Sequence, residues 1–298
     1  MLLDNDPVNQ PDTMALRQSD IFIVRWYIET IMPRATYGMP ALIEYSSLEE
    51  NLRLRRQLGL KFIELNMNMP YSFPEHLAPS LLRRIAKEED IFFTMHLPDE
   101  ADLGSIHDAL WQGQMRRARE TVEWATQAEV RLLNVHINSG CYFTLPDRRV
   151  WIYDQYNDEF VARQRLAMTE LADMAKEQGI LLCVENMSNF HLSFVRRAVE
   201  EVCNIPGVGI TWDIGHDARS GNMEGAVIRQ HLERLRHMHL HDYDGHSDHQ
   251  VPYTGGVDID GAILTAESRG LTVVIETKTA ASLQRSVEVL REHGVATL

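Results

Sequence analysis

The sequence lacks a hydrophobic run of membrane-spanning length. A transmembrane helix needs about 20 consecutive apolar residues, and no stretch of this chain comes near that number. Acidic residues precede the first apolar run near the N-terminus, a pattern that is wrong for a secretory signal peptide. We therefore expect a cytoplasmic protein that has no membrane partner.

Cysteine is scarce, with Cys141, Cys183 and Cys203 as the only three. They show neither the close spacing of a zinc site nor the even number of a disulfide framework. Cys183 lies within an apolar run, which favours a small buried core residue over a reactive one. This usage fits a reducing compartment.

The chain also has few basic residues, with 29 Lys and Arg against 43 Asp and Glu and a formal net charge of -14. That field repels polyanions unless a local basic cleft overrides it. The densest basic clusters, around Arg55 and Arg117, lie in segments with helical spacing, where a solvated helix face is the simpler interpretation. We expect no nucleic acid partner.

Short apolar runs alternate along the chain with longer amphipathic segments. The runs are aliphatic or β-branched through their middles, as is typical of strands buried on both faces of a sheet. They predict eight strands, at 35–39, 60–66, 91–97, 131–137, 180–186, 208–213, 236–241 and 271–276.

The segments between these runs predict helices, among them Ser47–Leu58, Ser105–Ala128, Phe160–Gln178 and Ser282–His293. Gly179 and Gly294 follow two of them as common C-terminal stops. Eight strand-then-helix units in one chain predict an α/β fold, a single-domain (β/α)₈ TIM barrel, over residues 35–298. An open doubly wound sheet is the alternative, but no glycine-rich dinucleotide fingerprint follows a strand.

Two segments fall outside this repeat. Residues 1–34 form a short N-terminal extension whose polar start predicts partial disorder. Within it, Ile21–Met32 is apolar and aromatic, and could pack on the barrel or form a contact in a homo-oligomer. Residues 138–156 are a long connection rich in aromatics, which predicts either a lid over the mouth of the barrel or a surface loop packed on its own side chains.

Polar side chains stand at the C-terminal ends of six consecutive predicted strands, where a barrel builds its active site. Six ionisable groups converging on one mouth would be costly without a counter-charge, and a divalent cation supplies one. Two Glu, one Asp and one His suit Mn²⁺, which we expect first, or Mg²⁺, Co²⁺ or Zn²⁺. The six residues are His96, His136, Glu185, Asp213, His239 and Glu276.

Five short motifs follow one another in a specific order: VEN at 184–186, TWDIGH at 211–216, HLHD at 239–242, His-x-x-Pro with glycines at 249–256, and IET at 275–277. In this order and spacing the sequence resembles the xylose-isomerase-like barrel superfamily over about residues 35–295. That group includes sugar phosphate isomerases and epimerases, ketose 3-epimerases and the endonuclease IV family.

The resemblance implies roles for individual residues. Glu185, Asp213, His239 and Glu276 resemble the shared metal ligands, and His216 resembles the histidine that contacts substrate or a second metal. His96, His136 and His249 resemble further zinc ligands of the nuclease branch. The pattern departs from that branch at Ser247, where the nuclease has Asp, although Asp248 is adjacent.

The resemblance implies a divalent-metal-dependent isomerase or epimerase of a sugar or sugar phosphate, a small polar substrate, acting through a metal-stabilised enediolate. Glu185 and Glu276 would be its acid and base, with His216 positioning a substrate oxygen. Lys278 shares the strand face of Glu276 and could bind a carboxylate or phosphate, or form a structural ion pair.

Two alternatives stay open. One is a metal-dependent hydrolase or lyase of the endonuclease IV-like branch, acting on a small phosphodiester or polar metabolite, which the additional histidines favour. The other is a barrel that binds a ligand without catalysis. The sequence leaves substrate identity, metal number and oligomeric state open.

Overall fold

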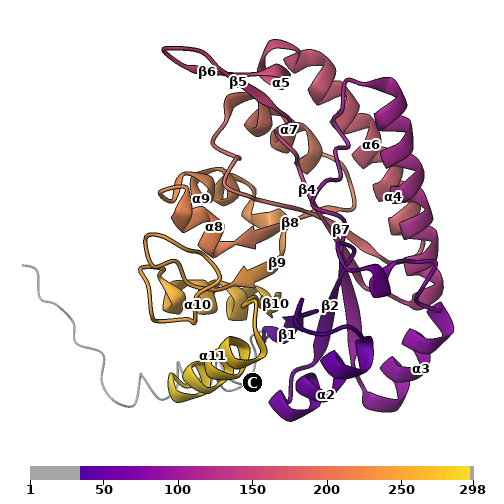
Figure 1. Cartoon of the computed structure of the whole chain (residues 1–298), viewed down its shortest axis with the longest axis vertical. Coiled ribbons are helices and arrows are strands. Elements are labelled where there is room, and N and C mark those ends of the chain that lie inside the picture. The colour runs from indigo at the N-terminus through magenta and orange to yellow at the C-terminus, as the bar shows by residue number, and fades with distance from the viewer. Residues whose placement is uncertain (1–33, 296–298) are drawn as a thin grey trace, which may run out of the picture.

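The computed structural model describes residues 34–295, which contain a closed barrel of eight parallel strands surrounded by helices (Figure 1). Around the barrel the strands follow the order β1-β10-β9-β8-β7-β4-β3-β2, and β1 pairs with β2 to close the ring. Their bounds are β1 Thr36–Pro40, β2 Phe62–Asn66, β3 Phe92–His96, β4 Leu132–His136, β7 Leu181–Glu185, β8 Val208–Asp213, β9 Leu235–Leu240 and β10 Thr272–Ile275.

All eight predicted strands are present, and the single (β/α)₈ barrel is confirmed over the open sheet. The middle residues of every barrel strand are buried because helices cover the outer face and side chains fill the interior. Cys183, in the middle of β7, is fully buried as predicted.

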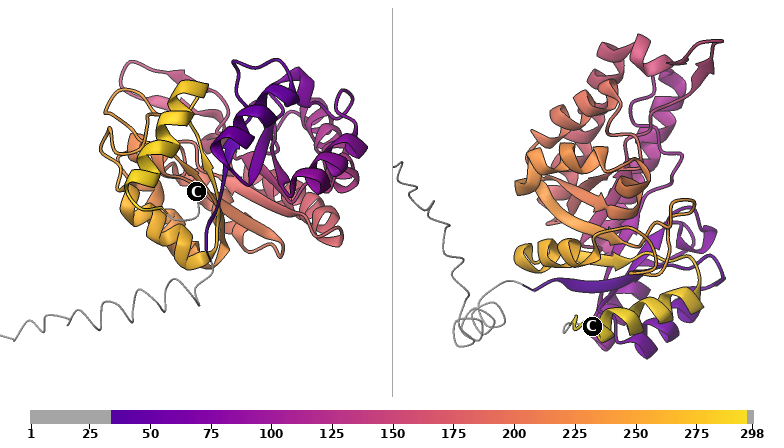
Figure 2. Two further views of the ribbon diagram at one scale, coloured as in Figure 1. Left: turned by 90° about the horizontal axis from the view of Figure 1, so that it is seen from below. Right: turned by 90° about the vertical axis from the view of Figure 1, so that its left-hand side faces the viewer.

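A helix or a pair of helices follows each strand. Their bounds are α2 Leu48–Leu58, α3 Pro79–Glu89, α4 Asp108–Ala128, α6 Asn157–Glu177, α7 Ser193–Cys203, α8 Ile214–Arg219, α9 Met223–Ile228, α10 Ile259–Arg269 and α11 Ala280–Glu292. Helices α3, α4 and α6 lie side by side along one flank of the barrel (Figure 1), and α11 packs beside α2 where the ring closes (Figure 2).

Local signals explain several helix ends. Ser47 caps α2 by accepting a hydrogen bond from the backbone of Glu50, and Gly59 ends it with a φ of 73°. Three predicted starts were wrong. The helix expected from Ser105 begins at Asp108, without a side-chain cap, and the helix expected from Phe160 begins three residues earlier, at Asn157. The helix expected from Ser282 begins two residues earlier, at Ala280, where Thr279 is the cap.

The long connection at 138–156 contains a small hairpin and a short helix. Strands β5 (Tyr142–Thr144) and β6 (Arg149–Trp151) pair antiparallel and project from the body (Figure 1), and α5 (Ile152–Gln155) follows them. Tyr142 packs against Trp151, with ring centroids 4.8 Å apart and an angle of 59° between the ring planes. The connection therefore packs partly on its own aromatic side chains.

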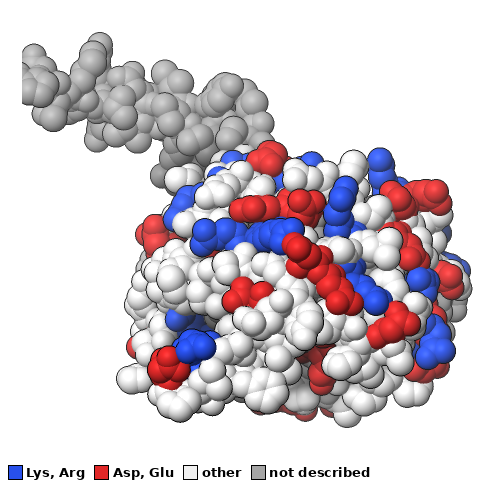
Figure 3. All heavy atoms as spheres, turned by 90° about the horizontal axis from the view of Figure 1, so that it is seen from above, with Lys and Arg blue, Asp and Glu red and all other residues white. Residues whose placement is uncertain are grey.

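The predicted N-terminal extension, including Ile21–Met32, lies outside the described residues except for Arg34. Within residues 34–295, none of the helices is long and apolar enough to cross a membrane. On the face drawn in Figure 3, Lys and Arg side chains alternate with Asp and Glu. The charges on that face thus do not form a patch of one sign.

Candidate metal centre

The four predicted metal ligands converge at the C-terminal mouth of the barrel. Glu185 and Asp213 are the last residues of β7 and β8, His239 is the fifth residue of β9, and Glu276 directly follows β10. Each offers one potential ligand atom, and these four atoms all lie within 4.8 Å of one another. The four residues lie between positions 185 and 276 of the sequence. Closure of the ring brings them together because the parallel strands all end on one face of the barrel.

His239 is at the middle of this group. Its Nδ1 lies 3.0 Å from Glu185 Oε1, 3.0 Å from Glu276 Oε2 and 3.9 Å from Asp213 Oδ2. The side chains of Glu185, Asp213 and His239 are at most 2% exposed, whereas that of Glu276 is 14% exposed. Glu276 thus forms the solvent-facing side of an otherwise buried set of donors.

The electrostatics of these groups are tightly linked. Burial alone would raise the pKa of Glu185, but His239 and His136 hold it well below its ordinary value. Burial opposes the charge on His239 too, yet Glu185, Glu64 and Glu276 raise its pKa well above the ordinary value. The carboxylates of Glu185, Asp213 and Glu276 therefore need positive charge at this point, which a divalent cation or a protonated histidine can supply.

Two buried atoms test whether a cation fits. His239 Nδ1 and Glu276 Oε2 lie 3.0 Å apart and neither makes a hydrogen bond, and His239 Nε2 makes none either. Buried polar atoms normally have such partners, so a pair of them within a cluster of carboxylates is well explained by a shared cation. Three carboxylates and one imidazole form a donor set that suits Mn²⁺, Mg²⁺, Co²⁺ or Zn²⁺. The residues present fit a divalent ion.

Asp213 is held in place from both sides. Its Oδ1 accepts the backbone N–H of His216 at 2.7 Å, so it caps helix α8. Its own N–H donates to Asn186 Oδ1 at 2.8 Å, and Asn186 Nδ2 donates to the buried Glu224 at 2.8 Å. Glu224 also accepts the backbone N–H of Phe190, which ties helix α9 and the loop after β7 to the centre.

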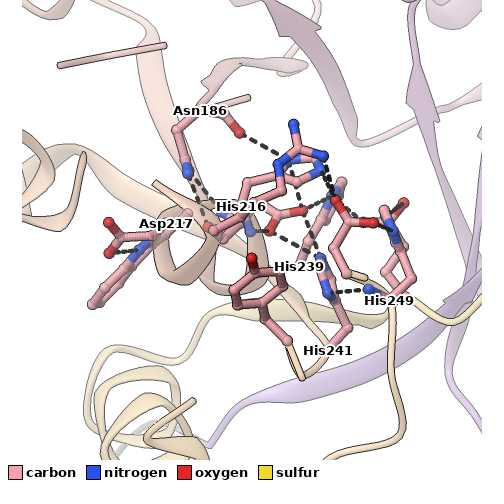
Figure 4. Close-up of polar contacts among 12 residues, drawn as sticks. Asn186, His216, Asp217, His239, His241 and His249 are labelled. Carbon is pink, nitrogen blue, oxygen red and sulfur yellow. Dashed lines mark hydrogen bonds and ion pairs between the residues drawn. The ribbon is translucent and has the colours of Figure 1, made fainter. Parts of the chain in front are cut away.

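A second group of histidines adjoins Asp213. Figure 4 shows His216, His241 and His249 turned toward one another, and together with Asp213 they form a second set of ligand atoms within 4.8 Å of one another. His241 Nε2 lies 3.0 Å from Asp213 Oδ1, and its ring stacks on that of His249 with centroids 4.2 Å apart. Asp248, not Ser247, faces these histidines, with its Oδ1 2.9 Å from His249 Nδ1.

A third group lies on the other side of Glu185. His96 Nε2 is 3.3 Å and His136 Nε2 is 3.5 Å from the Glu185 carboxylate. Asn134 donates its amide to the same carboxylate and is itself oriented by Thr211, whose hydroxyl donates to Asn134 Oδ1 at 2.7 Å. Glu185 is therefore shared between two potential cation sites.

Glu64 is a site residue that the sequence analysis missed. Its Oε1 lies 2.9 Å from His239 Nε2, and its Oε2 accepts hydrogen bonds from His237 Nε2 at 3.1 Å and from the Thr94 hydroxyl at 3.0 Å. A carboxylate this close to Nε2 favours the proton on that nitrogen, and in that tautomer the Nδ1 lone pair would face Glu185. The sequence signal that could have identified Glu64 is its charge, which is unusual in the middle of the predicted buried strand 60–66.

Replacing Glu64 with Gln is expected to weaken binding of Mn²⁺ about 10- to 100-fold, because an amide does not fix the proton on His239 Nε2 as a carboxylate does. Calorimetric titration of metal-free protein measures this. Glu267→Gln is a matched control, since Glu267 contacts Tyr37 and Ala35 away from the centre. Unchanged affinity in a folded Glu64→Gln protein would contradict the assignment.

Lys278 forms the structural ion pair that was one of its two predicted roles. Its Nζ lies 2.7 Å from Glu276 Oε1. Its side chain is 55% exposed, and the nearby carboxylates of Glu276, Asp213 and Glu185 raise its pKa above its ordinary value. The positive charge of Lys278 therefore acts on the same carboxylates as the His239 ring does.

The chain belongs to the xylose isomerase-like TIM barrel family, whose model matches residues 52–293. A sequence relative is an uncharacterised protein of Methanocaldococcus jannaschii, 22% identical over 234 residues that cover 73% of this chain and 76% of the relative.

Similar solved structures share the fold at low identity. A D-tagatose 3-epimerase-like protein has a TM-score of 0.72 at 19% identity, over 88% of this chain and 98% of that chain. A D-allulose 3-epimerase from Methylomonas sp. has a TM-score of 0.66 at 18% identity, over 87% and 98%. The IOLI protein with a bound zinc atom has a TM-score of 0.66 at 18% identity, over 86% and 97%.

Proposed function

We propose that this member of the xylose isomerase-like TIM barrel family is a divalent-metal-dependent isomerase or epimerase of a sugar. One observation carries the proposal: two carboxylates from different strands, Glu185 and Glu276, each lie 3.0 Å from His239 Nδ1 in a shared donor set. An isomerase or epimerase needs two groups that can remove and return a proton at the same substrate.

The similar structures support this reaction class without deciding it. Several are named as epimerases of ketoses, and one contains zinc. A shared fold hosts many chemistries, so the argument depends on the site itself. We propose Mn²⁺ as the first ion to test, with Mg²⁺, Co²⁺ and Zn²⁺ as alternatives, since the donors are mainly oxygen.

The residues of the centre would have separate roles in the reaction. A divalent ion bound by Glu185, Asp213, His239 and Glu276 would supply Lewis-acid polarisation of a substrate carbonyl. One of the two glutamates would take the proton from the carbon beside that carbonyl, and the other would return a proton on the opposite face or the adjacent carbon. His216, whose side chain is 14% exposed, would orient a substrate hydroxyl from the Asp213 side.

The test is exchange of carbon-bound hydrogen with solvent. Protein loaded in turn with Mn²⁺, Mg²⁺, Co²⁺ or Zn²⁺ is incubated with ketopentoses and ketohexoses in D₂O and followed by NMR. We expect deuterium to enter at the carbon beside the carbonyl with at least one ketose, and to stop entering after chelation of the metal. Absence of exchange with every sugar and every metal would refute the proposal.

A second candidate function is a metal-dependent hydrolase of a small phosphodiester. His96, His136 and Glu185 favour it, because this third group could hold another ion next to the first. Two or more zinc ions per chain, with one lost in His136→Ala, would favour hydrolysis. One ion per chain that is kept in His136→Ala would favour the isomerase or epimerase.

A further inference from the structure

A pocket of about 580 Å³ lies on the outer side of the barrel wall. It is bounded by α10 on one side and by α8 and the 3₁₀ helix η2 (Arg229–Arg234) on the other, on the flank where Figure 1 shows α8, α9 and α10. Trp212 lines it from β8, and successive strand residues point to opposite faces, so it lies behind the strand that presents Asp213 to the centre. We call it the α10 pocket. Among the described residues that line it, none is one of the four candidate metal ligands.

The lining of the α10 pocket includes apolar side chains that water can reach. Trp212, Leu232 and Val257 are half-buried, and Leu264 is 66% exposed. Helix α10 turns one face to the pocket, because its lining positions 261, 264, 265 and 268 recur at the spacing of a helix face. A contiguous apolar surface of this kind marks a contact site for another segment or another molecule.

The charged side chains of the α10 pocket balance one another. Arg229 and Arg269 line it together with Asp217 and Asp258. Arg269 also donates from Nη1 to the carbonyl of Leu232 at 2.9 Å, which ties the end of α10 to η2. A lining without net charge favours neither an anion nor a cation, and its apolar side chains favour an occupant that is rich in apolar side chains.

The described part of the chain begins beside this pocket. The backbone N–H of Ala35 donates to Glu267 Oε2 at 3.0 Å, and the Tyr37 hydroxyl donates to Glu267 Oε1 at 3.2 Å. Glu267 lies in the last turn of α10, next to Ser268 and Arg269, which line the pocket. The residues that precede Ala35 in the sequence therefore start within reach of the pocket.

Residues 21–32, which lie outside the described residues, have a composition that suits the pocket. Nine of these twelve residues are Ile, Val, Met, Phe, Trp or Tyr, and the segment has one positive and one negative charge, Arg25 and Glu29. Helix α10 has 11 residues and is therefore about 16 Å long, a distance that twelve residues span in any regular conformation. The segment is long enough to follow α10 from its end to its start.

We propose that residues 21–32 bind in the α10 pocket of their own chain and cover Leu264 and Trp212. Burial of apolar surface on both sides would stabilise the contact by about 25 cal/mol per Å². Only two residues separate the segment from Ala35, and so short a connection gives a high effective concentration that favours the same chain over a second copy. The inference is independent of the proposed enzymatic function.

The test follows trypsin cleavage after Arg25 in the full chain, with the cleavage sites identified by mass spectrometry. A bound segment is cleaved only when it leaves the pocket, so we expect slow cleavage in the original protein. Leu264→Asp places a charge in the contact and should accelerate cleavage after Arg25 at least about tenfold. If nothing covered Leu264, a change at so exposed a position would have little effect.

Leu110→Asp is the matched control. Leu110 lies on α4, is 63% exposed and is not among the residues that line the α10 pocket. This variant should leave the rate of cleavage after Arg25 unaltered. The rate in the original protein should also stay the same over a roughly 50-fold range of protein concentration, because the contact is within one chain.

Three results would overturn the inference. In the first, Leu264→Asp leaves the rate of cleavage after Arg25 unchanged, which means that the segment does not cover Leu264. In the second, Leu110→Asp accelerates this cleavage as much as Leu264→Asp does, which means that the protection does not come from the α10 pocket. In the third, cleavage slows as the protein concentration rises, which identifies a second copy of the chain as the partner of the segment.

Discussion

Replacing Glu185 with Gln is expected to lower kcat/KM for deuterium exchange by roughly 10³- to 10⁴-fold, the upper range for loss of a general acid or base. Glu185 is both a potential ligand and a potential proton-transfer group, and it is shared between His239 on one side and His96 and His136 on the other. The amide has no negative charge to attract a cation, so metal content measured by mass spectrometry should fall with the activity.

The matched control is Glu177→Gln, the same change of carboxylate to amide at an exposed position on α6. It should leave both activity and metal content as they were. Glu185→Gln protein that retains bound metal and exchanges deuterium at the original rate would exclude Glu185 from the centre. A melting temperature within a few degrees of the original would show that the loss is not one of folding.

Replacing Gly215 with Ala is expected to destabilise the fold by about 2 kcal/mol and to disturb the site, because the added methyl group overpacks it. A Cβ at this position would lie 2.0 Å from His241 Cε1 and 2.2 Å from its Nδ1. His241 cannot easily move, since it contacts Asp213, accepts the backbone N–H of His249 and stacks on that ring.

Gly113→Ala serves as the control for this substitution. Gly113 lies within α4, and an added Cβ would have no heavy atom within 4 Å. Alanine is the better helix former, so this variant should be more stable by about 0.5–1 kcal/mol. Thermal unfolding and metal titration of both proteins measure the effects. Equal stability and equal metal affinity in Gly215→Ala and the parent would contradict the geometry around His241.

The similar epimerase structures are below 20% identical to this chain, so they share its fold and leave its chemistry open. The donor set at the mouth of the barrel favours metal chemistry. Histidines on both sides of Glu185 keep hydrolysis as the competing function until the number of bound ions is measured.

The barrel and the order of its polar strand ends follow from local patterns in the sequence. Buried strands read as continuous apolar runs of four to seven residues, and this local signal needs no knowledge of neighbours. Because parallel strands all end on one face, Glu185, Asp213, His239 and Glu276 could be placed at one mouth from their positions alone. Helix starts were less well determined, since Asp108 and Asn157 begin helices without a side-chain cap.

The other side chains that support these four residues come from distant parts of the chain and are identified by their contacts in the folded barrel. Glu64 lies on β2, more than 170 residues before His237 and His239 in the sequence, and its carboxylate contacts both histidines. Asn134 contacts Glu185 on the neighbouring strand, and Glu224 contacts Asn186 in the loop after β7. The contact of Arg219 with Asp248 likewise joins two separate segments. Strand periodicity is a local property of the chain, whereas the partner of a buried charge is set by ring closure and loop geometry, which no short pattern encodes.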